Sequence, residues 1–394
     1  MKILFCQFST KFLYKGMIQD IASKYYNMIY IKRKKAGYYK NDHFWEVPLW
    51  IAEACYILKR FNKKLYIIQD IKQAINYINN YPAEYILFSV LDINKNYVYK
   101  IIRSCRNKKF IIGGYINFTA FKKLDNCIIL DNMQGLAGYF NSKYTYGTNY
   151  KLFKNYKIIP RLVLSTGCTN RCKFCTIEKT ILEKTKNEII AQIKSFKHLK
   201  FKLVYINDKT FFQAKNYYLL DHAYHEIKKY NKAFKGFIIQ STVHEINKRS
   251  IKDIKKLHIK IIELGIESFN NKLLALLHKP QNEKMILACM DKLKNSGIKI
   301  IGNFIIGILQ ENKKTYTNTL KFIRQYIKNF YILNIYNLAI YNNCDLAKDI
   351  KTKDKNSNNE LSIYKDYYSI QDKQNIKYFN DNIFKLGIKI LNNK

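Results

Sequence analysis

Short apolar runs alternate with amphipathic stretches through the first 150 residues, and this alternation predicts strands that are followed by helices. The runs expected to form strands cover residues 2–6, 64–68, 85–89 and 109–112. Helices are expected at residues 48–59 and 97–106. Such β–α–β alternation predicts a doubly wound, Rossmann-like α/β domain. A ligand of that domain would bind at the carboxyl ends of the strands.

The same alternation continues through the second part of the chain, where it repeats six times. Strands are expected at 162–165, 202–206, 236–240, 260–264, 298–306 and 331–336. Helices are expected at 181–196, 213–230 and 247–257, in the region that ends at 295, and at 313–328. Six parallel β/α units predict a partial (β/α)6 TIM-type barrel, whose site lies at the carboxyl ends of its strands.

The last residues change in composition. Residues 348–360 are rich in Lys, Asp and Asn and are expected to form a linker, and a helix is expected at 376–391. The predicted organisation is therefore a Rossmann-like domain over 1–150, a barrel over 151–345, and a linker with a C-terminal helical extension over 346–394.

The net charge of +40 brings in nucleic acid as a candidate partner, but only eight of the 69 basic residues are arginines. Proteins that bind phosphates and bases favour arginine and cluster it on one face. We therefore expect a small-molecule or peptide substrate rather than a nucleic acid.

No apolar stretch approaches the roughly 20 residues of a membrane span, and the N-terminus lacks the pattern of a secretory signal. A cytoplasmic protein is expected.

Three of the nine cysteines are crowded into one loop, after a strand and Gly167: Cys168, Cys172 and Cys175. A structural zinc site normally uses four ligands, and an ordinary electron-transfer iron–sulfur cluster uses four cysteines. No paired set of cysteines follows downstream. A cluster held by three thiolates would leave one iron open to a substrate. His222 and His225, at i,i+3 spacing, are instead read as surface or core residues.

The loop resembles the signature of the radical S-adenosylmethionine (SAM) superfamily, C-x3-C-x2-C with an aromatic residue, here Phe174, before the last cysteine. The resemblance implies a [4Fe–4S] cluster on the three cysteines. It also implies that SAM binds the fourth iron and is cleaved by one electron to a 5′-deoxyadenosyl radical. An electron donor such as a flavodoxin or ferredoxin is then expected as a partner.

Polar residues at the predicted strand ends resemble further motifs of this superfamily. Asn207-Asp208 resembles its second-strand turn, Gly265-Ile-Glu267-Ser268 its fourth-strand G-[IV]-E-S, and the segment from Gly302 to Glu311 its fifth-strand motif, with Leu309 in place of proline. The resemblance assigns Asp208 to the methionine ammonium, Glu267 and Ser268 to the ribose or methionine, and Asn303 to the adenosine, with help from Gln240 and Ser241. The alternative reading for each is an ordinary polar residue at a strand end.

The N-terminal domain resembles the cobalamin-binding domain that precedes the barrel in one branch of this superfamily. The resemblance rests on the segment from Pro48 to Asp70 and on four candidate cobalamin residues: Ser89, Leu91, Gly113 and Gly114. The D-x-H-x-x-G loop that supplies a histidine to cobalt is absent, and His43 is the only histidine before residue 150. Cobalamin would then bind without a protein lower ligand, or the domain would only shape the substrate cleft.

Three functions stay open at this point. A radical SAM enzyme of this kind would transfer a methyl group to an unreactive carbon or phosphorus if it binds cobalamin. Without cobalamin, the same radical would drive a rearrangement, an oxidation or a thiolation. A methylthiotransferase acting on tRNA or a ribosomal protein would use three more cysteines, of which Cys6, Cys55 and Cys105 are a superficial counterpart without matching flanks. A third alternative is a non-catalytic, basic nucleic-acid-binding protein that holds zinc or an iron–sulfur cluster. The sequence does not identify the substrate.

Overall fold

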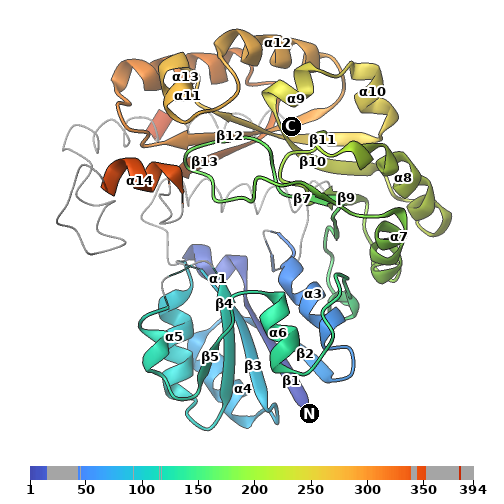
Figure 1. Cartoon of the computed structure of the whole chain (residues 1–394), viewed down its shortest axis with the longest axis vertical. Coiled ribbons are helices and arrows are strands. Elements are labelled where there is room, and N and C mark those ends of the chain that lie inside the picture. Colours follow the sequence, from blue (N-terminus) through green and yellow to red (C-terminus); the bar gives the residue numbers. More distant parts are fainter. Residues whose placement is uncertain are drawn as a thin grey trace. The chain divides into compact units, whose positions relative to one another are not determined.

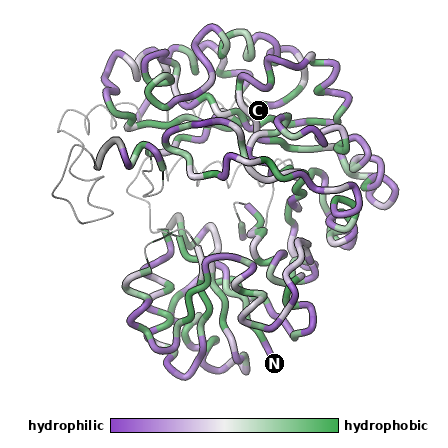
Figure 2. Tube along the Cα trace, in the orientation of Figure 1, coloured by the Kyte–Doolittle hydropathy of each residue, from purple (hydrophilic) through white to green (hydrophobic). Residues whose placement is uncertain are grey.

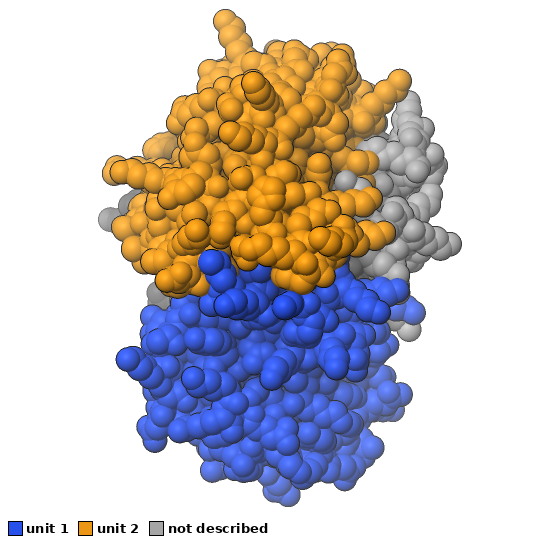
Figure 3. Space-filling view, turned by 90° about the vertical axis from the view of Figure 1, so that its right-hand side faces the viewer, with its two compact units in different colours: residues 1–23, 33–160, 190–201 blue, residues 24–32, 161–189, 202–394 orange. Residues whose placement is uncertain are grey.

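The computed structural model describes residues 1–15, 43–44, 46–91, 93–114, 116, 118–338, 344–351 and 381–382. These form two compact units, coloured separately in Figure 3. The first unit holds the described residues up to Pro160 together with Ile190–Phe201. The second holds Arg161–Ile189 and the described residues from Lys202 onward. Most of the linker and C-terminal helix expected after residue 346 lies outside the described residues.

The first unit is a five-stranded parallel sheet of order β2-β1-β3-β4-β5 (Figure 1). Its strands are β1 (Lys2–Phe8), β2 (Asn62–Ile68), β3 (Tyr85–Val90), β4 (Lys109–Gly114) and β5 (Cys127–Ile129). Its helices are α1 (Thr10–Lys15), α3 (Leu49–Ile57), α4 (Ile71–Asn80), α5 (Lys95–Ser104) and α6 (Met133–Tyr139), with short 3-10 helices η1 (Phe121–Lys123) and η2 (Lys151–Phe153).

Helices cover both faces of this sheet because successive side chains of a strand point to opposite faces. Leu4 and Cys6 of β1 belong to a core cluster with residues of α4 and α5. Phe5, between them, has its ring 5.7 Å from the ring of Trp50 in α3. Figure 2 shows the strands as the hydrophobic interior of the unit. The predicted doubly wound fold is confirmed.

The second unit is a six-stranded parallel sheet of order β13-β12-β11-β10-β9-β6. Its strands are β6 (Arg161–Leu162), β9 (Leu203–Ile206), β10 (Gly236–Thr242), β11 (Ile259–Glu267), β12 (Lys299–Ile306) and β13 (Phe330–Asn337). Two short strands, β7 (Ser165–Thr166) and β8 (Leu182–Glu183), pair antiparallel beside it. The predicted partial barrel of six β/α units is confirmed.

The helices that follow these strands in the chain are shorter than the sequence pattern predicts. They are α7 (Lys186–Ser195), η3 (Lys215–Tyr218), α8 (Leu219–Tyr230), α9 (Val243–Asn247), α10 (Ile251–Lys256), α11 (Asn271–Leu276), α12 (Glu283–Lys294), α13 (Lys313–Gln325) and α14 (Asp345–Lys351). The helix expected at 181–196 starts only at Lys186, because Thr185 and Glu188 exchange hydrogen bonds in a capping box at that point. The helix expected at 247–257 is shortened to α10, which begins after its N-cap Ser250, and α9 before it was not predicted.

The pattern also missed four helices and strands of the first unit, which are α1, α4, β5 and α6, and its two 3-10 helices. Asp70 begins α4 by accepting a hydrogen bond from the Gln73 backbone, and Asn132 begins α6 in the same way from Gly135. The linker expected from Lys348 is wrong at its start, because α14 continues to Lys351. Among the described residues, no helix is both long and apolar enough to cross a bilayer.

Candidate active site

The segment Cys168–Cys175, named here the cluster loop, follows β7 at the carboxyl end of the barrel's first strand. Gly167 precedes it with φ = 87°, a conformation that suits glycine. A side chain at this position would also overlap the carbonyl oxygen of Thr180. The Cys168 backbone then donates to the Glu178 carbonyl over 2.9 Å. The chain after the loop therefore packs tightly against Gly167, and no larger residue fits there.

The thiols of the cluster loop are free, and Cys168 and Cys172 are buried whereas Cys175 is partly exposed. All three line one cavity. A structural zinc site normally uses four ligands, and no other cysteine or histidine of the described residues lines this cavity. Three thiols without a fourth such ligand suit an iron–sulfur cluster with one open iron.

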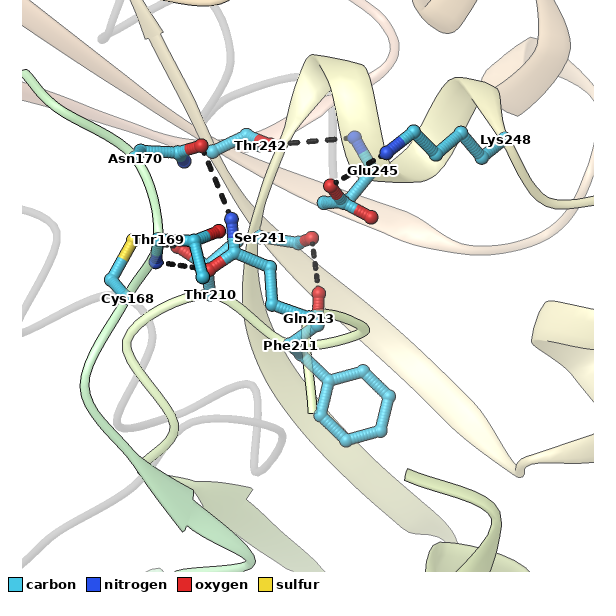
Figure 4. Close-up of polar contacts among 10 residues, drawn as sticks. All are labelled: Cys168, Thr169, Asn170, Thr210, Phe211, Gln213, Ser241, Thr242, Glu245 and Lys248. Carbon is cyan, nitrogen blue, oxygen red and sulfur yellow. Dashed lines mark hydrogen bonds and ion pairs between the residues drawn. The ribbon is translucent and has the colours of Figure 1, made fainter. Parts of the chain in front are cut away.

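The loop after β9 holds the cluster loop from one side (Figure 4). Gln213 accepts a hydrogen bond from the Thr169 backbone over 3.0 Å and donates to the Asn170 side chain over 3.1 Å. Thr210 Oγ1 lies 3.2 Å from Cys168 Sγ. The same loop is tied to β10, since Ser241 donates to the Phe211 carbonyl over 2.9 Å. Thr210 and Gln213 follow the strand-end motif directly, but sequence reasoning did not select them.

A cavity of about 350 Å³ opens beside the cysteines at the carboxyl ends of the strands. Eight of the predicted site residues line it: Cys168, Cys172, Phe174, Cys175, Gln240, Ser241, Glu267 and Asn303. Phe174 also packs against a core cluster that includes Leu273 and Ile305. Asp208 and Ser268 do not line the cavity. The barrel thus gathers most of the residues that the motifs selected, from the cluster loop and from three further strands, β10, β11 and β12.

Lys279 lines the same cavity and was missed by the sequence analysis. Its ammonium donates to Glu267 Oε1 over 3.0 Å, and both side chains are 10% exposed or less. Burial alone would lower the pKa of Lys279, but the charges of Glu267 and Cys172 raise it above its ordinary value. Burial raises the pKa of the Cys172 thiol, and the Lys279 ammonium opposes that increase. The cavity therefore holds a buried cation beside the thiols.

The backbone around Glu267 is unusual and accounts for its position. Glu267 has φ = 63°, and the pairing of β11 with β12 shifts register between Gly265 and Glu267. Gln281 supports this bulge by donating to the carbonyls of Gly265 and Ile266. The bulge turns Glu267 into the cavity. The Ser268 hydroxyl and the Gln281 amide oxygen are buried without a hydrogen-bond partner, but neither residue lines the cavity.

Asn303 on β12 is held by side chains from neighbouring strands of the barrel. Its amide nitrogen donates to Glu263 Oε1 over 3.0 Å, and its oxygen accepts from Asn334 over 2.9 Å. Glu263 also accepts a hydrogen bond from the Tyr205 hydroxyl over 2.8 Å. The Asn334 oxygen is buried without a partner. This network fixes the orientation of Asn303 at the cavity wall.

Asp208, which the motif assigns to the methionine ammonium, lies outside the cavity lining and contacts the chain before the cluster loop. One of its oxygens accepts hydrogen bonds from the Leu164 and Ser165 backbones at 2.9 and 3.0 Å, and the other accepts from the Ser165 hydroxyl at 2.6 Å. Burial raises the pKa of Asp208 to about 6, although these hydrogen bonds oppose the increase. The carboxyl group thus joins β9 to the chain that leads into the cluster loop.

Glu311 closes the turn after β12 in a similar way. Its carboxylate accepts hydrogen bonds from the Gly307 and Ile308 backbones at 2.7 and 3.0 Å, and Gly307 has φ = 77°. Burial raises the pKa of Glu311 to about 7, although hydrogen bonds from Tyr316 and the two backbone groups oppose the increase. The last residue of the fifth-strand motif therefore shapes a loop and does not line the cavity.

This raised pKa predicts a pH-dependent stability. The folded protein binds the Glu311 proton more tightly than the unfolded chain, so ionisation above pH 7 costs the fold about 3 kcal/mol at 1.36 kcal/mol per pKa unit. That cost disappears as the pH falls through 7 towards 4.5. Glu311→Gln is therefore expected to be more stable than the wild type at pH 8, with the difference vanishing near pH 5. Urea unfolding at both pH values measures this, with the exposed Glu84→Gln as control. An equal difference at both pH values would refute it.

The first unit has a cavity of about 320 Å³ at the carboxyl ends of β3 and β4. Ser89, Gly113 and Gly114 line it together with residues of α3 and α6, whereas Leu91 and His43 do not. A side chain at Gly113 would lie 2.7 Å from the Leu130 carbonyl oxygen, so close strand packing already requires this glycine. The cavity is at the lower end of ligand-pocket sizes, about 300–1,000 Å³. No histidine is among the described residues that line it.

The remaining cysteines do not form a second centre in the described part of the chain. Cys6 and Cys105 lie in one core cluster, and Cys55 is buried in α3. Burial raises the pKa of Cys55 to about 12 and that of Cys105 to about 11. Cys6, Cys55 and Cys105 are therefore core residues.

Comparison with known proteins matches residues 162–323 to the family described as the radical SAM superfamily. A protein of Methanocaldococcus jannaschii that carries the provisional name of a methylthiotransferase is 26% identical over 170 residues, which are 40% of this chain and 37% of that protein. The match thus spans well under half of this curated relative.

Solved structures resemble most of the chain. The radical SAM methyltransferase TsrM of Kitasatospora setae, solved with cobalamin and a [4Fe–4S] cluster, aligns with a TM-score of 0.59 and 8% identity over 89% of this chain and 78% of its own. The cobalamin-dependent SAM radical enzyme OxsB, solved with aqua-cobalamin and SAM, aligns with a TM-score of 0.61 and 13% identity over 90% of this chain and 61% of its own. At these identities the likeness is one of fold.

Proposed function

We propose that the chain is a member of the radical SAM superfamily, whose family model matches residues 162–323, and that it reductively cleaves SAM in the cavity beside Cys168, Cys172 and Cys175. One observation carries the proposal: three free thiols line the same cavity as a buried lysine and glutamate. A [4Fe–4S] cluster bound by these thiols would supply the electron that splits the sulfonium of SAM.

The residues around the cavity suit the polar groups of SAM. Lys279 offers a buried ammonium to the methionine carboxylate, and Glu267 offers a carboxylate to the ammonium or the ribose hydroxyls. Asn303, fixed by Glu263 and Asn334, presents an amide at the cavity wall. Each of these polar groups of SAM would then contact a side chain of opposite charge or a complementary hydrogen-bond donor or acceptor. Without a ligand, Lys279 and Glu267 satisfy each other.

Replacement of Lys279 tests this assignment. Lys279→Met is expected to raise the KM for SAM by at least about 30-fold, because losing one partner of a buried charge pair costs about 2–5 kcal/mol. Iron content should not change, since the three cysteines are intact. The exposed Lys294→Met on α12 is the control. An unchanged KM in Lys279→Met, at equal iron content, would show that the ammonium does not contact SAM.

Binding at an open iron has its own test. Electron paramagnetic resonance of the reduced, reconstituted protein is expected to change its g-values when SAM is added, because the ligand alters the coordination of the cluster. The unchanged spectrum of a cluster whose irons all have protein ligands would oppose the proposal.

We further propose that the first unit binds cobalamin and that the enzyme methylates an unreactive carbon or phosphorus of its substrate. The support is the cavity lined by Ser89, Gly113 and Gly114 at the carboxyl ends of β3 and β4, together with the fold likeness to TsrM and OxsB. Because His43 does not line the cavity, cobalamin would bind without a protein ligand below the cobalt. The substrate would be a small molecule or a peptide.

A binding assay with hydroxocobalamin tests the proposed cobalamin site separately from the barrel site. The protein is expected to retain about one equivalent of cobalamin after gel filtration. Ser89→Trp should abolish retention, because the indole would fill the cavity, while the iron content stays the same. Retention equal to that of an unrelated protein would leave the first unit as a scaffold and would not affect the barrel site.

Methylthiotransfer is the second candidate, and the match to the Methanocaldococcus jannaschii protein favours it. It would require a sulfur source, and Cys6, Cys55 and Cys105 do not gather into one centre. Incorporation of sulfur into the product would favour methylthiotransfer over methylation.

For either function we propose a flavodoxin or ferredoxin as electron donor. We also propose a cytoplasmic location, since all nine cysteines are free thiols.

A further inference from the structure

Three metal-binding side chains meet at the end of β11 opposite to Glu267. Asp221 and His225 lie on α8, and His258 immediately precedes the first residue of β11 (Figure 1). One ligand atom from each lies within 4.8 Å of the others, the only such group of three among the described residues. The group could not be found from the sequence pattern, because His222 and His225 form the more obvious pair and His258 is 33 residues beyond His225 along the chain.

The distances suit one small ion. His258 Nε2 lies 3.0 Å and His225 Nε2 lies 3.6 Å from the same oxygen, Asp221 Oδ1. A tetrahedral zinc ion with bonds of about 2.0–2.1 Å to nitrogen and oxygen holds its ligand atoms about 3.3 Å apart. Asp221 and His225 are four residues apart on one helix, so they share a face. Small side-chain movements would bring all three atoms to bonding distance.

His258 is held firmly in place for a residue on the surface. Its ring stacks on Tyr224 with centroids 3.5 Å apart and planes 6° from parallel. Its backbone has φ = 57°, and its carbonyl accepts a hydrogen bond from Phe237 over 3.0 Å. Gly236 allows this contact, because a side chain there would overlap the His258 carbonyl. The imidazole is thus oriented towards α8 by packing as well as by its hydrogen bond to Asp221.

We propose that Asp221, His225 and His258 bind a divalent transition-metal ion, with zinc as the preferred ion. Two imidazoles and one carboxylate form a ligand set that suits zinc, whereas calcium and magnesium prefer oxygen ligands. Because His225 is 64% exposed and Asp221 43%, water can complete the coordination. The ion would join α8 to the start of β11. The site is independent of the cluster loop, and the proposal does not rest on SAM cleavage.

Equilibrium dialysis of the full chain against zinc alone tests the proposal. The cluster is reconstituted first, so that its cysteines are occupied, and zinc is counted by mass spectrometry at physiological salt. One equivalent is expected to bind. His225→Gln should weaken binding by more than about 100-fold, since even the loss of an outer-shell partner of a metal ligand costs about 10–100-fold. His222→Gln, on the same helix and outside the group, should bind like the wild type.

The absorption spectrum of bound Co²⁺ then distinguishes this site from the three cysteine thiols. In a full-length variant with Cys168, Cys172 and Cys175 replaced by alanine, Co²⁺ should give visible d–d bands without thiolate charge-transfer absorption, and His225→Gln should remove them. Circular dichroism verifies that each variant is folded. Equal zinc binding by His225→Gln and the wild type, or less than one equivalent in both His222→Gln and the wild type, would overturn the proposal.

Discussion

Cys172→Ala is expected to abolish formation of 5′-deoxyadenosine and to reduce the reconstituted iron to near zero. Cys172 is buried, its backbone carbonyl accepts a hydrogen bond from Cys175 over 3.1 Å, and its thiol lies within the electrostatic field of Lys279. Two remaining thiolates cannot hold a cluster that needs three protein ligands. Iron and sulfide assays after anaerobic reconstitution, with product measured by chromatography, give the result.

The matched control is Cys127→Ala in β5, which removes a thiol from the other unit. It should retain both iron and activity. Circular dichroism of both variants excludes unfolding as the cause. Full iron content in Cys172→Ala would show that this cysteine is not a cluster ligand.

Gly167→Ala is expected to destabilise the protein by about 3 kcal/mol or more. The left-handed conformation at φ = 87° costs a residue with a side chain about 1–2 kcal/mol, and the overlap with the Thr180 carbonyl adds about 1–3 kcal/mol as overpacking. For a unit of this size each 1 kcal/mol lowers the melting temperature by about 2–4 °C. A decrease of about 6–12 °C should follow, and the displaced cluster loop should incorporate less iron.

Gly297→Ala separates the two causes. Gly297 has a similar φ of 79°, but nothing lies within 4 Å of the position that a side chain would take. Only the conformational cost of about 1–2 kcal/mol then applies, and iron content should be normal. Equal losses of stability in both variants would refute the argument that the chain packs against Gly167.

Most of the barrel could be predicted because parallel strands bring their carboxyl ends to one edge. Glu267, Asn303 and Gln240 lie on three different strands and line one cavity, as that geometry requires. The cluster loop could be predicted because its cysteines are close in sequence. The six parallel β/α units could be predicted from the alternation of apolar and polar positions alone.

Other parts of the site depended on contacts that spacing does not encode. Lys279 lies on no strand and meets Glu267 because of the chain's path after α11. Asp208 carries the expected carboxylate, but its oxygens accept hydrogen bonds from Leu164 and Ser165. A strand-end motif therefore identifies which residues are polar and close together, and it does not distinguish a ligand contact from a bond that shapes the loop.

The central claim is that the cavity beside the three cysteines binds SAM and that the bound cluster cleaves it. Anaerobically reconstituted wild-type protein, incubated with SAM and dithionite, should form 5′-deoxyadenosine and methionine in equal amounts, and should form none without reductant. Fully iron-loaded protein that leaves SAM intact in the presence of dithionite would contradict the account.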